Sequence, residues 1–178
     1  MARTTIDYGI DLGTTNSAIA RMENGKPIIK KSQSQKDTTP SCVAFNKKKA
    51  IVVGDKGLSQ LLKELLLVYK KNDPTLLNTF IEFKRTMGTD EDYKSKHMGR
   101  SYLSEELSAE VVKSLKSYIR DEDLNSIVIT VPAKFQGNQN DATMKAAQLA
   151  GFQHYILLQE PIAASMAYGI DAKDIDGE

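Results

Sequence analysis

The sequence predicts an α/β protein with a mixed five-stranded sheet and helices, plus a smaller inserted α+β subdomain. Two observations predict the sheet: three strand-like segments open the chain, and from Ser104 onward helical and strand-like segments alternate. A third predicts the insertion, because a polar stretch at residues 32–40 precedes a segment with strands and helices of its own. We therefore expect a core subdomain at residues 1–39 and 104–178, and a peripheral subdomain at residues 40–103.

The opening segments are expected to form an antiparallel meander. Ile6–Leu12 alternates loosely and ends in a turn composition, and Ser17–Met22 resumes the apolar pattern. Asn24-Gly25 then supplies a two-residue hairpin turn that needs positive φ, so Lys26–Lys30 is expected to be the third strand.

The inserted segment is expected to hold two short strands, at residues 43–45 and 51–53, followed by a helix. The helix is indicated by apolar side chains at helical spacing, which are Leu58, Leu61, Leu62, Leu65, Leu66 and Tyr69. Residues 76–87 are expected to form a second helix. Residues 89–100 are charged and show little periodicity, which predicts a loop.

The last third of the chain is expected to alternate helices with strands. Ser104 is predicted to be the N-cap of the first helix, because Glu105 and Glu106 follow in its first turn. The β-branched run Ile127–Val131 predicts a buried strand ended by Pro132. The remaining expected elements are a helix at about residues 138–150, a strand at 155–158 and a helix from Pro161 to Tyr168.

Composition excludes several classes of protein. The chain has 178 residues with 24 Lys+Arg against 23 Asp+Glu, and a formal charge of +1 lacks the basic surplus that nucleic-acid or membrane-surface binding needs. The single Cys42 cannot form an internal disulfide, and the longest apolar run, residues 65–69, cannot span a bilayer. We expect a cytoplasmic protein without nucleic-acid or membrane partners.

The sharpest motif is the run from Asp11 through Leu12, Gly13, Thr14 and Thr15 to Asn16. A carboxylate at a strand end, followed by a glycine turn with two hydroxyls, suits a phosphate group, and Asp11 could hold Mg²⁺ through water. No Walker A sequence and no GxGxxG turn that opens a helix occur in the chain. The alternative is an ordinary β-turn in which Asp and Thr side chains cap backbone groups.

Lys84 and Glu160 each have two interpretations. Lys84 is either a surface lysine whose stem covers apolar residues or an ammonium placed where phosphoryl charge develops. Glu160, directly before Pro161, is either a carboxylate at a helix start or a group that orients an attacking or metal-bound water. Neither residue decides between these alternatives alone.

Several motifs in a fixed order resemble the actin-like ATPases (ribonuclease H-like fold), and most closely the seventy-kilodalton heat-shock chaperones of the DnaK type. The resemblance extends over about residues 6–171. The segments that carry it are Gly9–Ser17, Thr38–Ser41, Phe83–Arg85, Leu107–Val111, Val128–Ala133, Glu160-Pro161 and Ala167–Gly169.

The resemblance implies the first lobe of a two-lobed ATPase domain with ATP or ADP and Mg²⁺ between the lobes. The phosphate-wrapping residues would be Gly13, Thr14, Thr15 and Asn16, and Asp11 would hold the waters of the metal. Lys84 would stabilise the γ-phosphate and the attacking water, and Glu160 would lie near the metal. Pro132 would act as a switch residue that couples nucleotide state to peptide affinity.

The implied parent is a chaperone that couples ATP hydrolysis to binding and release of unfolded peptides, with a J-domain co-chaperone and a nucleotide-exchange factor as partners. The chain ends before the second phosphate loop and the adenosine pocket, so we expect no turnover from it alone. Lys134 and Asn140 stand where the family commonly has Tyr and Arg, which leaves the peptide coupling open. The alternatives are a non-catalytic interaction module and part of an actin-like filament ATPase.

Overall fold

The computed structural model describes residues 6–163. Its strands are β1 (Tyr8–Leu12), β2 (Asn16–Glu23), β3 (Lys26–Ile29), β4 (Thr39–Pro40), β5 (Cys42–Phe45), β6 (Ile51–Val53), β7 (Thr79–Ile81), β8 (Asp92–Ser95), β9 (Arg100–Leu103), β10 (Ser126–Val131) and β11 (His154–Gln159). The α-helices are α1 (Asp55–Lys71), α2 (Ser104–Lys116) and α3 (Gly137–Leu149), and the 3₁₀ turns are η1 (Pro74–Leu76) and η2 (Phe83–Thr86).

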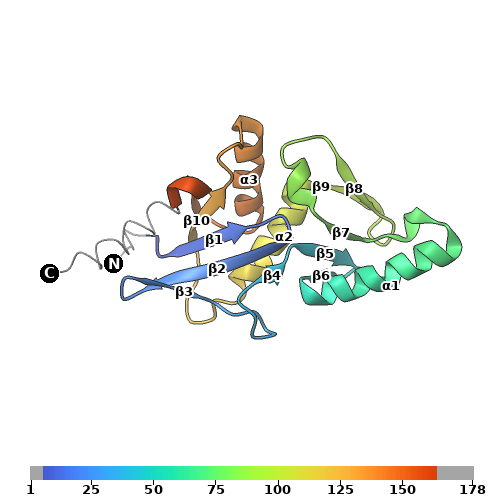
Figure 1. Ribbon diagram of the computed structural model, residues 1–178, viewed down its shortest axis with the longest axis horizontal. Helices are drawn as coiled ribbons and strands as arrows, with labels where there is room; N and C mark the ends of the chain where they lie inside the picture. The colour runs from blue at the N-terminus through green and yellow to red at the C-terminus, as the bar shows by residue number, and fades with distance from the viewer. Residues whose placement is uncertain (1–5, 164–178) are drawn as a thin grey trace.

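The main sheet is mixed, as predicted (Figure 1). Its strand order is β11-β10-β1-β2-β3, and β4 pairs with β2 beside this path. β1 is parallel to β10, which is parallel to β11, whereas β1, β2 and β3 form the expected antiparallel meander. Asn24 and Gly25 adopt φ of 52° and 76°, the left-handed pair that a two-residue hairpin turn requires.

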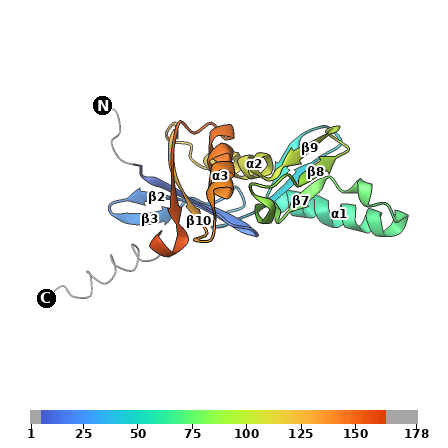
Figure 2. The same cartoon turned by 90° about the horizontal axis from the view of Figure 1, so that it is seen from above.

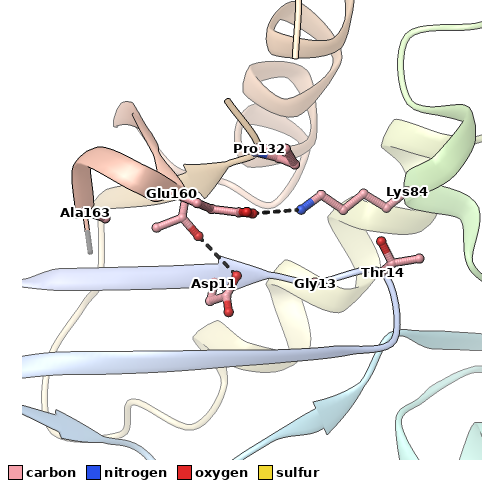
Figure 3. A pocket seen from close by; sticks show the side chains of 8 residues that line it. Asp11, Gly13, Thr14, Lys84, Pro132, Glu160 and Ala163 are labelled. Atoms are coloured by element: carbon pink, nitrogen blue, oxygen red, sulfur yellow. Dashed lines mark hydrogen bonds and ion pairs between the residues drawn. The ribbon is translucent and has the colours of Figure 1, made fainter. Parts of the chain in front are cut away.

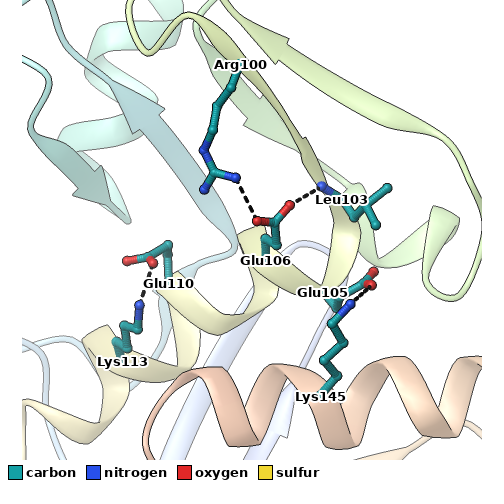
Figure 4. Close-up of polar contacts among 7 residues, drawn as sticks. All are labelled: Arg100, Leu103, Glu105, Glu106, Glu110, Lys113 and Lys145. Carbon is teal, nitrogen blue, oxygen red and sulfur yellow. Dashed lines mark hydrogen bonds and ion pairs between the residues drawn. The ribbon is translucent and has the colours of Figure 1, made fainter.

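Helices α2 and α3 pack against each other beside the main sheet, where α2 contacts β1 and β2 and α3 contacts β11. The buried apolar positions of α2 include Leu107, Val111 and Leu115, which recur at helical spacing. An ion pair of 3.1 Å from Lys145 of α3 to Glu105 of α2 joins the two helices (Figure 4). The core is therefore built between the sheet and this helix pair.

The expected N-cap of α2 at Ser104 is wrong by one residue. Ser104 is the first helical residue and Leu103 occupies the N-cap position, because Glu106 accepts the Leu103 N–H at 2.8 Å and also pairs with Arg100 (Figure 4). The Ser104 hydroxyl instead donates to the carbonyl of Phe83 in η2. The Ser104 side chain, which the local pattern assigned to capping the helix, therefore binds the buried carbonyl of another element.

Residues 42–103 carry two smaller sheets, one of order β6-β5-β7 and one formed by β8 and β9. The expected helix at 76–87 is wrong: this segment forms η1, β7 and η2, because residues 79–81 pair with β5. The expected loop at 89–100 is also wrong, because β8 and β9 form a hairpin there. Tertiary pairing outweighs local pattern in both segments.

Helix α1 confirms the helix predicted from the leucines, but other residues supply its packing face. Gly57 allows the helix to approach β5, since a Cβ there would lie 3.0 Å from Cys42 Sγ. Glu64 is buried, and its carboxylate accepts the Asn78 N–H at 2.9 Å and a Gln60 amide hydrogen bond at 2.7 Å. Several of the leucines consequently point to solvent.

Residues 160–163 are helical, which agrees with the expected start of the last helix. The remainder of that helix up to Tyr168, and the motif Ala167–Gly169, lie outside the described residues. Between residues 6 and 163, no helix is long and apolar enough to cross a membrane.

Gly88 yields the first prediction. Its φ is +73°, and an added Cβ would lie 2.6 Å from the backbone oxygen of Asn138 at the start of α3. We expect Gly88→Ala to lower the free energy of unfolding by about 3 kcal/mol or more, through left-handed strain together with a backbone clash. Denaturant unfolding measures the change.

Gly99→Ala is the matched control, because Gly99 has φ of +69° and an added Cβ there would meet nothing within 4 Å. It should cost only the left-handed penalty of about 1 kcal/mol. Equal losses for both variants would contradict the close approach of Gly88 to α3.

Candidate functional site

Three parallel strands end at the same edge of the main sheet, and their ends form a pocket (Figure 3). The strands are β1, β10 and β11, and Asp11, Pro132 and Glu160 stand at or just beyond their carboxyl ends. A cavity of about 550 Å³ opens there, lined by Asp11, Gly13, Thr14, Lys84, Thr130, Pro132, Glu160 and Ala163. Ligands of open α/β sheets bind at such a crevice outside the carboxyl ends of strands.

The glycine turn after β1 leaves no space for a side chain at Gly13. An added Cβ would lie 2.0 Å from the backbone oxygen of Asn16, so only glycine fits. The turn is held from below by two buried serines: Ser17 Oγ accepts the Gly13 N–H at 3.1 Å, and Ser41 Oγ donates to the Gly13 carbonyl at 2.7 Å. The two hydroxyls also contact each other at 2.8 Å.

The four residues of the turn do not lie equally close to the pocket. Gly13 and Thr14 line it, whereas Thr15 and Asn16 are exposed and are not among the lining residues. Thr15 contributes its carbonyl, which accepts the Ser41 N–H at 2.8 Å. Within the described chain, the Thr14 hydroxyl makes no hydrogen bond, which leaves it available to a bound group.

Lys84 reaches the pocket from η2, on the side opposite Asp11 (Figure 3). Only 7% of its side chain is exposed, its Nζ lies 3.7 Å from Glu160 Oε1, and it stands 5.5 Å from the centre of the Phe135 ring. Burial lowers the pKa of the Lys84 ammonium, and the carboxylates of Glu160 and Asp11 partly offset this. This is an ammonium directed into a cavity rather than a lysine that covers the surface.

The acidic side chains of the pocket fit a hydrated Mg²⁺ rather than a closed metal site. Asp11 accepts a hydrogen bond of 3.1 Å from Thr130 Oγ1, and Glu160 is 47% exposed. Two carboxylates are too few for a cage, and no group of three or more metal-ligating side chains occurs among residues 6–163. Mg²⁺ keeps several waters and commonly takes its other ligands from phosphates, so this donor set suits it.

The pocket can therefore receive an anionic group that carries a hydrated cation. Its lining offers the Thr14 hydroxyl and the glycine turn, the Lys84 ammonium, and the carboxylates of Asp11 and Glu160. This is the distribution of charge that phosphoryl transfer requires, in which cations stabilise the transferred group and carboxylates orient the metal or water.

Several residues that line or support this pocket were not identified from the sequence as site residues. Thr130 lines the pocket and orients Asp11, Phe135 stands beside Lys84, and Ser17 and Ser41 hold the glycine turn. A signal for Thr130 existed in the sequence, because it is the polar residue within the otherwise apolar run Ile127–Val131. In the structure it lies on the opposite face from Ile129 and Val131. Ser17 and Ser41 lie inside the family motifs Gly9–Ser17 and Thr38–Ser41, but their hydrogen bonds to Gly13 depend on tertiary structure.

The comparisons agree on one family. The family described as Hsp70 protein matches residues 7–178. The chain is 40% identical over 172 residues to a protein named chaperone protein DnaK from Ureaplasma urealyticum serovar 10, and 39% identical over 169 residues to the same-named protein from Mesomycoplasma hyopneumoniae. These matches cover 95% and 93% of this chain and 26% of each relative, so the chain spans about a quarter of their length.

The hydrogen bonds beneath the glycine turn yield a prediction. Ser41→Ala removes the donor to the Gly13 carbonyl and the partner of Ser17 Oγ, both in a buried position. We expect it to lower the free energy of unfolding by about 1–3 kcal/mol. Ser34→Ala, at an exposed serine, should change stability by less than about 0.5 kcal/mol in the same denaturant titration. An equally small change in the free energy of unfolding for Ser41→Ala would contradict the conclusion that Ser41 supports the Gly13 turn.

Lys84 yields a prediction on pH. Because its folded pKa is lowered, the unfolded chain binds more protons between that pKa and the ordinary lysine pKa of 10.5, so wild-type stability should rise with pH in this window. Lys84→Met should remove the rise and increase stability at pH 7 by about 1 kcal/mol, since Glu160 stays partly solvated. Urea unfolding in Mg²⁺-free buffer tests this, and a less stable variant at pH 7 would contradict it.

Proposed function

The chain belongs to the Hsp70 family, and from this membership we propose that its pocket binds the phosphates of ATP or ADP in the ATPase domain of a cytoplasmic chaperone. The observation that carries the proposal is the convergence of Asp11, Gly13, Thr14, Lys84 and Glu160 on one cavity. These residues come from separate elements, and no local structural need brings their charges together. A β-turn capped by its own side chains would not need an ammonium from η2.

Each residue has a distinct role in this proposal. The turn at Gly13, Thr14, Thr15 and Asn16 wraps the phosphates, of which Gly13 and Thr14 line the cavity itself. Lys84 stabilises charge on the transferred phosphoryl group, because its buried ammonium is poorly hydrated and interacts strongly at short range.

Asp11 and Glu160 would hold the water shell of Mg²⁺, which supplies charge neutralisation to the phosphates when it is bound. Thr130 fixes the Asp11 carboxylate by its 3.1 Å hydrogen bond. Glu160 also pairs with Lys84, so it keeps the ammonium directed into the cavity and is placed to accept a proton from an attacking water.

Hydrolysis is proposed for the full-length protein and not for this chain alone. The described pocket is open, so water would reach the reacting groups and the site would lack the enclosure that electrostatic catalysis uses. The relatives are about four times as long, which leaves room for a second lobe and for peptide-binding parts.

We propose that Pro132 couples the site to those parts. It lines the cavity at the end of β10, and its carbonyl accepts the Phe135 N–H at 3.0 Å, so a shift of Pro132 would move the ring beside Lys84. Unfolded peptides, a J-domain co-chaperone and a nucleotide-exchange factor are the proposed partners. Lys134 and Asn140 replace family residues near this segment, so its peptide coupling is expected to differ in strength.

We also propose that the chain divides into a core subdomain, residues 1–39 and 104–178, and a peripheral subdomain, residues 40–103. The separate small sheets of residues 42–103 support this division, while β4 marks the crossing between them. Residues 164–178 belong to the proposed core but lie outside the described part.

Substitution of Lys84 tests the proposed mechanism. In the full-length protein, Lys84→Ala should lower the rate constant of ATP hydrolysis by about 100-fold or more and change ATP affinity by only a few-fold. The reason is that the ammonium interacts mainly with charge that develops in the transition state. Single-turnover hydrolysis and equilibrium ATP titration measure the two effects separately.

Lys113→Ala is the matched control, because Lys113 is an exposed lysine of α2 that pairs with Glu110. It should change neither quantity. An equal loss of binding and turnover in Lys84→Ala would make Lys84 a ground-state binding residue, and unchanged hydrolysis would refute its proposed role.

A further inference from the structure

Helix α1 has an apolar surface that no other described element covers. Its apolar stripe consists of Leu62, Leu65, Leu66 and Tyr69, whose exposed fractions are 65%, 46%, 62% and 88%. The spacings of three and four residues place these side chains together on one side of the helix. Side chains of this size are rarely left exposed as a group, and such groups mark interaction sites.

A row of lysines lies next to the apolar stripe. Lys56, Lys63 and Lys70 recur every seven residues, so they align along the helix at intervals of about 10 Å. All three are exposed, and none forms an ion pair with a residue in the described range 6–163. At 3.6 residues per turn, the packing face, the apolar stripe and the lysine row lie about 120° apart around the helix.

Acidic residues of the helix do not neutralise this row. Asp55 pairs with Lys36 at 2.7 Å, and Glu64 is buried with its oxygens engaged by Asn78 and Gln60. Figures 1 and 2 place α1 at the end of the molecule away from β3, with one long side open. The outer surface of α1 is therefore both apolar and positively charged.

A pocket of about 290 Å³ adjoins the row at Lys63. Its lining includes the basic residues Lys47, Lys63, Lys71 and His97, the apolar residues Leu67 and Leu76, and the buried Glu64. The pocket can receive single acidic or apolar side chains. A protein segment presents such protruding side chains, whereas a bilayer presents a flat surface.

A second copy of the chain does not complement this surface. If two α1 helices packed through their apolar stripes in antiparallel orientation around a two-fold axis, both lysine rows would lie on the same side of the seam. No acidic residue of α1 is free to stand opposite them, because Asp55 pairs with Lys36 and Glu64 is buried, so like charges would repel. Charge complementarity requires a partner that carries acidic residues.

We propose that the outer surface of α1 is a docking site for an acidic amphipathic helix of a partner protein. Its apolar residues would cover Leu62, Leu65, Leu66 and Tyr69, and its acidic residues would pair with Lys56, Lys63 and Lys70. Helix packing through such a seam, with flanking charges that select the partner, is the usual geometry of two-stranded helical association. The site lies apart from the proposed nucleotide pocket and does not depend on it.

The test uses the full-length protein and a labelled three-heptad helical peptide with Leu at the seam positions and Glu at the flanking positions. We expect saturable binding by fluorescence anisotropy that weakens between about 0.05 M and about 0.5 M salt. The paired substitutions Lys63→Glu with Lys70→Glu, and Leu62→Ser with Leu66→Ser, should each weaken binding by about tenfold or more. A scrambled peptide of the same composition should bind at least about tenfold more weakly, because its stripe is lost.

Matched control variants carry the same changes on the exposed edge strand β3. Lys26→Glu and Ile28→Ser should leave peptide affinity within about twofold of wild type. Circular dichroism and thermal unfolding establish that each variant is folded.

If peptide affinity is insensitive to the α1 variants, or if the full-length protein does not bind the peptide because another part of it covers α1, the proposal is refuted. Preferential α1-dependent binding to phosphatidylglycerol vesicles over the peptide would also overturn it, in favour of a membrane surface.

Discussion

The parallel alignment of β1, β10 and β11 is the constraint on which the pocket depends. The register pairs Asp11 with Thr130, and Thr130 with Leu158, so the three strands reach the same edge of the sheet at the same height. Each strand then delivers one side chain or turn to that edge. A slip of one residue in either pairing would turn the side chains to the opposite face and separate Asp11 from its Thr130 hydrogen bond.

The inserted segment supplies the remaining parts of the pocket. Ser41, just after β4, supports the Gly13 turn, and Lys84 enters from η2, where the Ser104 hydroxyl binds the Phe83 carbonyl. The ammonium is nearly buried although burial lowers its pKa, so its position has an energetic cost. Packing alone does not explain a lysine there, because an apolar side chain would fill the same space without that cost. A charge kept at this expense is typical of a functional site.

The sequence predicted the elements whose patterns are local and failed where pairing is long-range. The meander, the buried strand β10 and the helices α2 and α3 follow from turn residues and periodicity. Residues 76–87 have an apolar content that also fits a helix, but the pairing of residues 79–81 with β5 makes a strand there and leaves only 3₁₀ turns on either side. At the site, Asp11 and Gly13 were recognisable as a motif, whereas Lys84 gained significance through a family resemblance and Thr130 and Phe135 through tertiary contacts.

Helix α1 shows why periodicity predicts a helix but not which side of it is buried. Its leucines gave the correct secondary structure, yet close packing is made by Gly57, which lets the helix approach β5, and by Glu64, which caps a buried backbone N–H. The helix thus carries more regularly spaced apolar side chains than the packing of this fold uses. Exposed leucine beside unneutralised lysine gains little in an isolated chain, since both the apolar area and the charges remain in water. The two features become favourable together only when a surface of opposite charge and matching apolar pattern covers them.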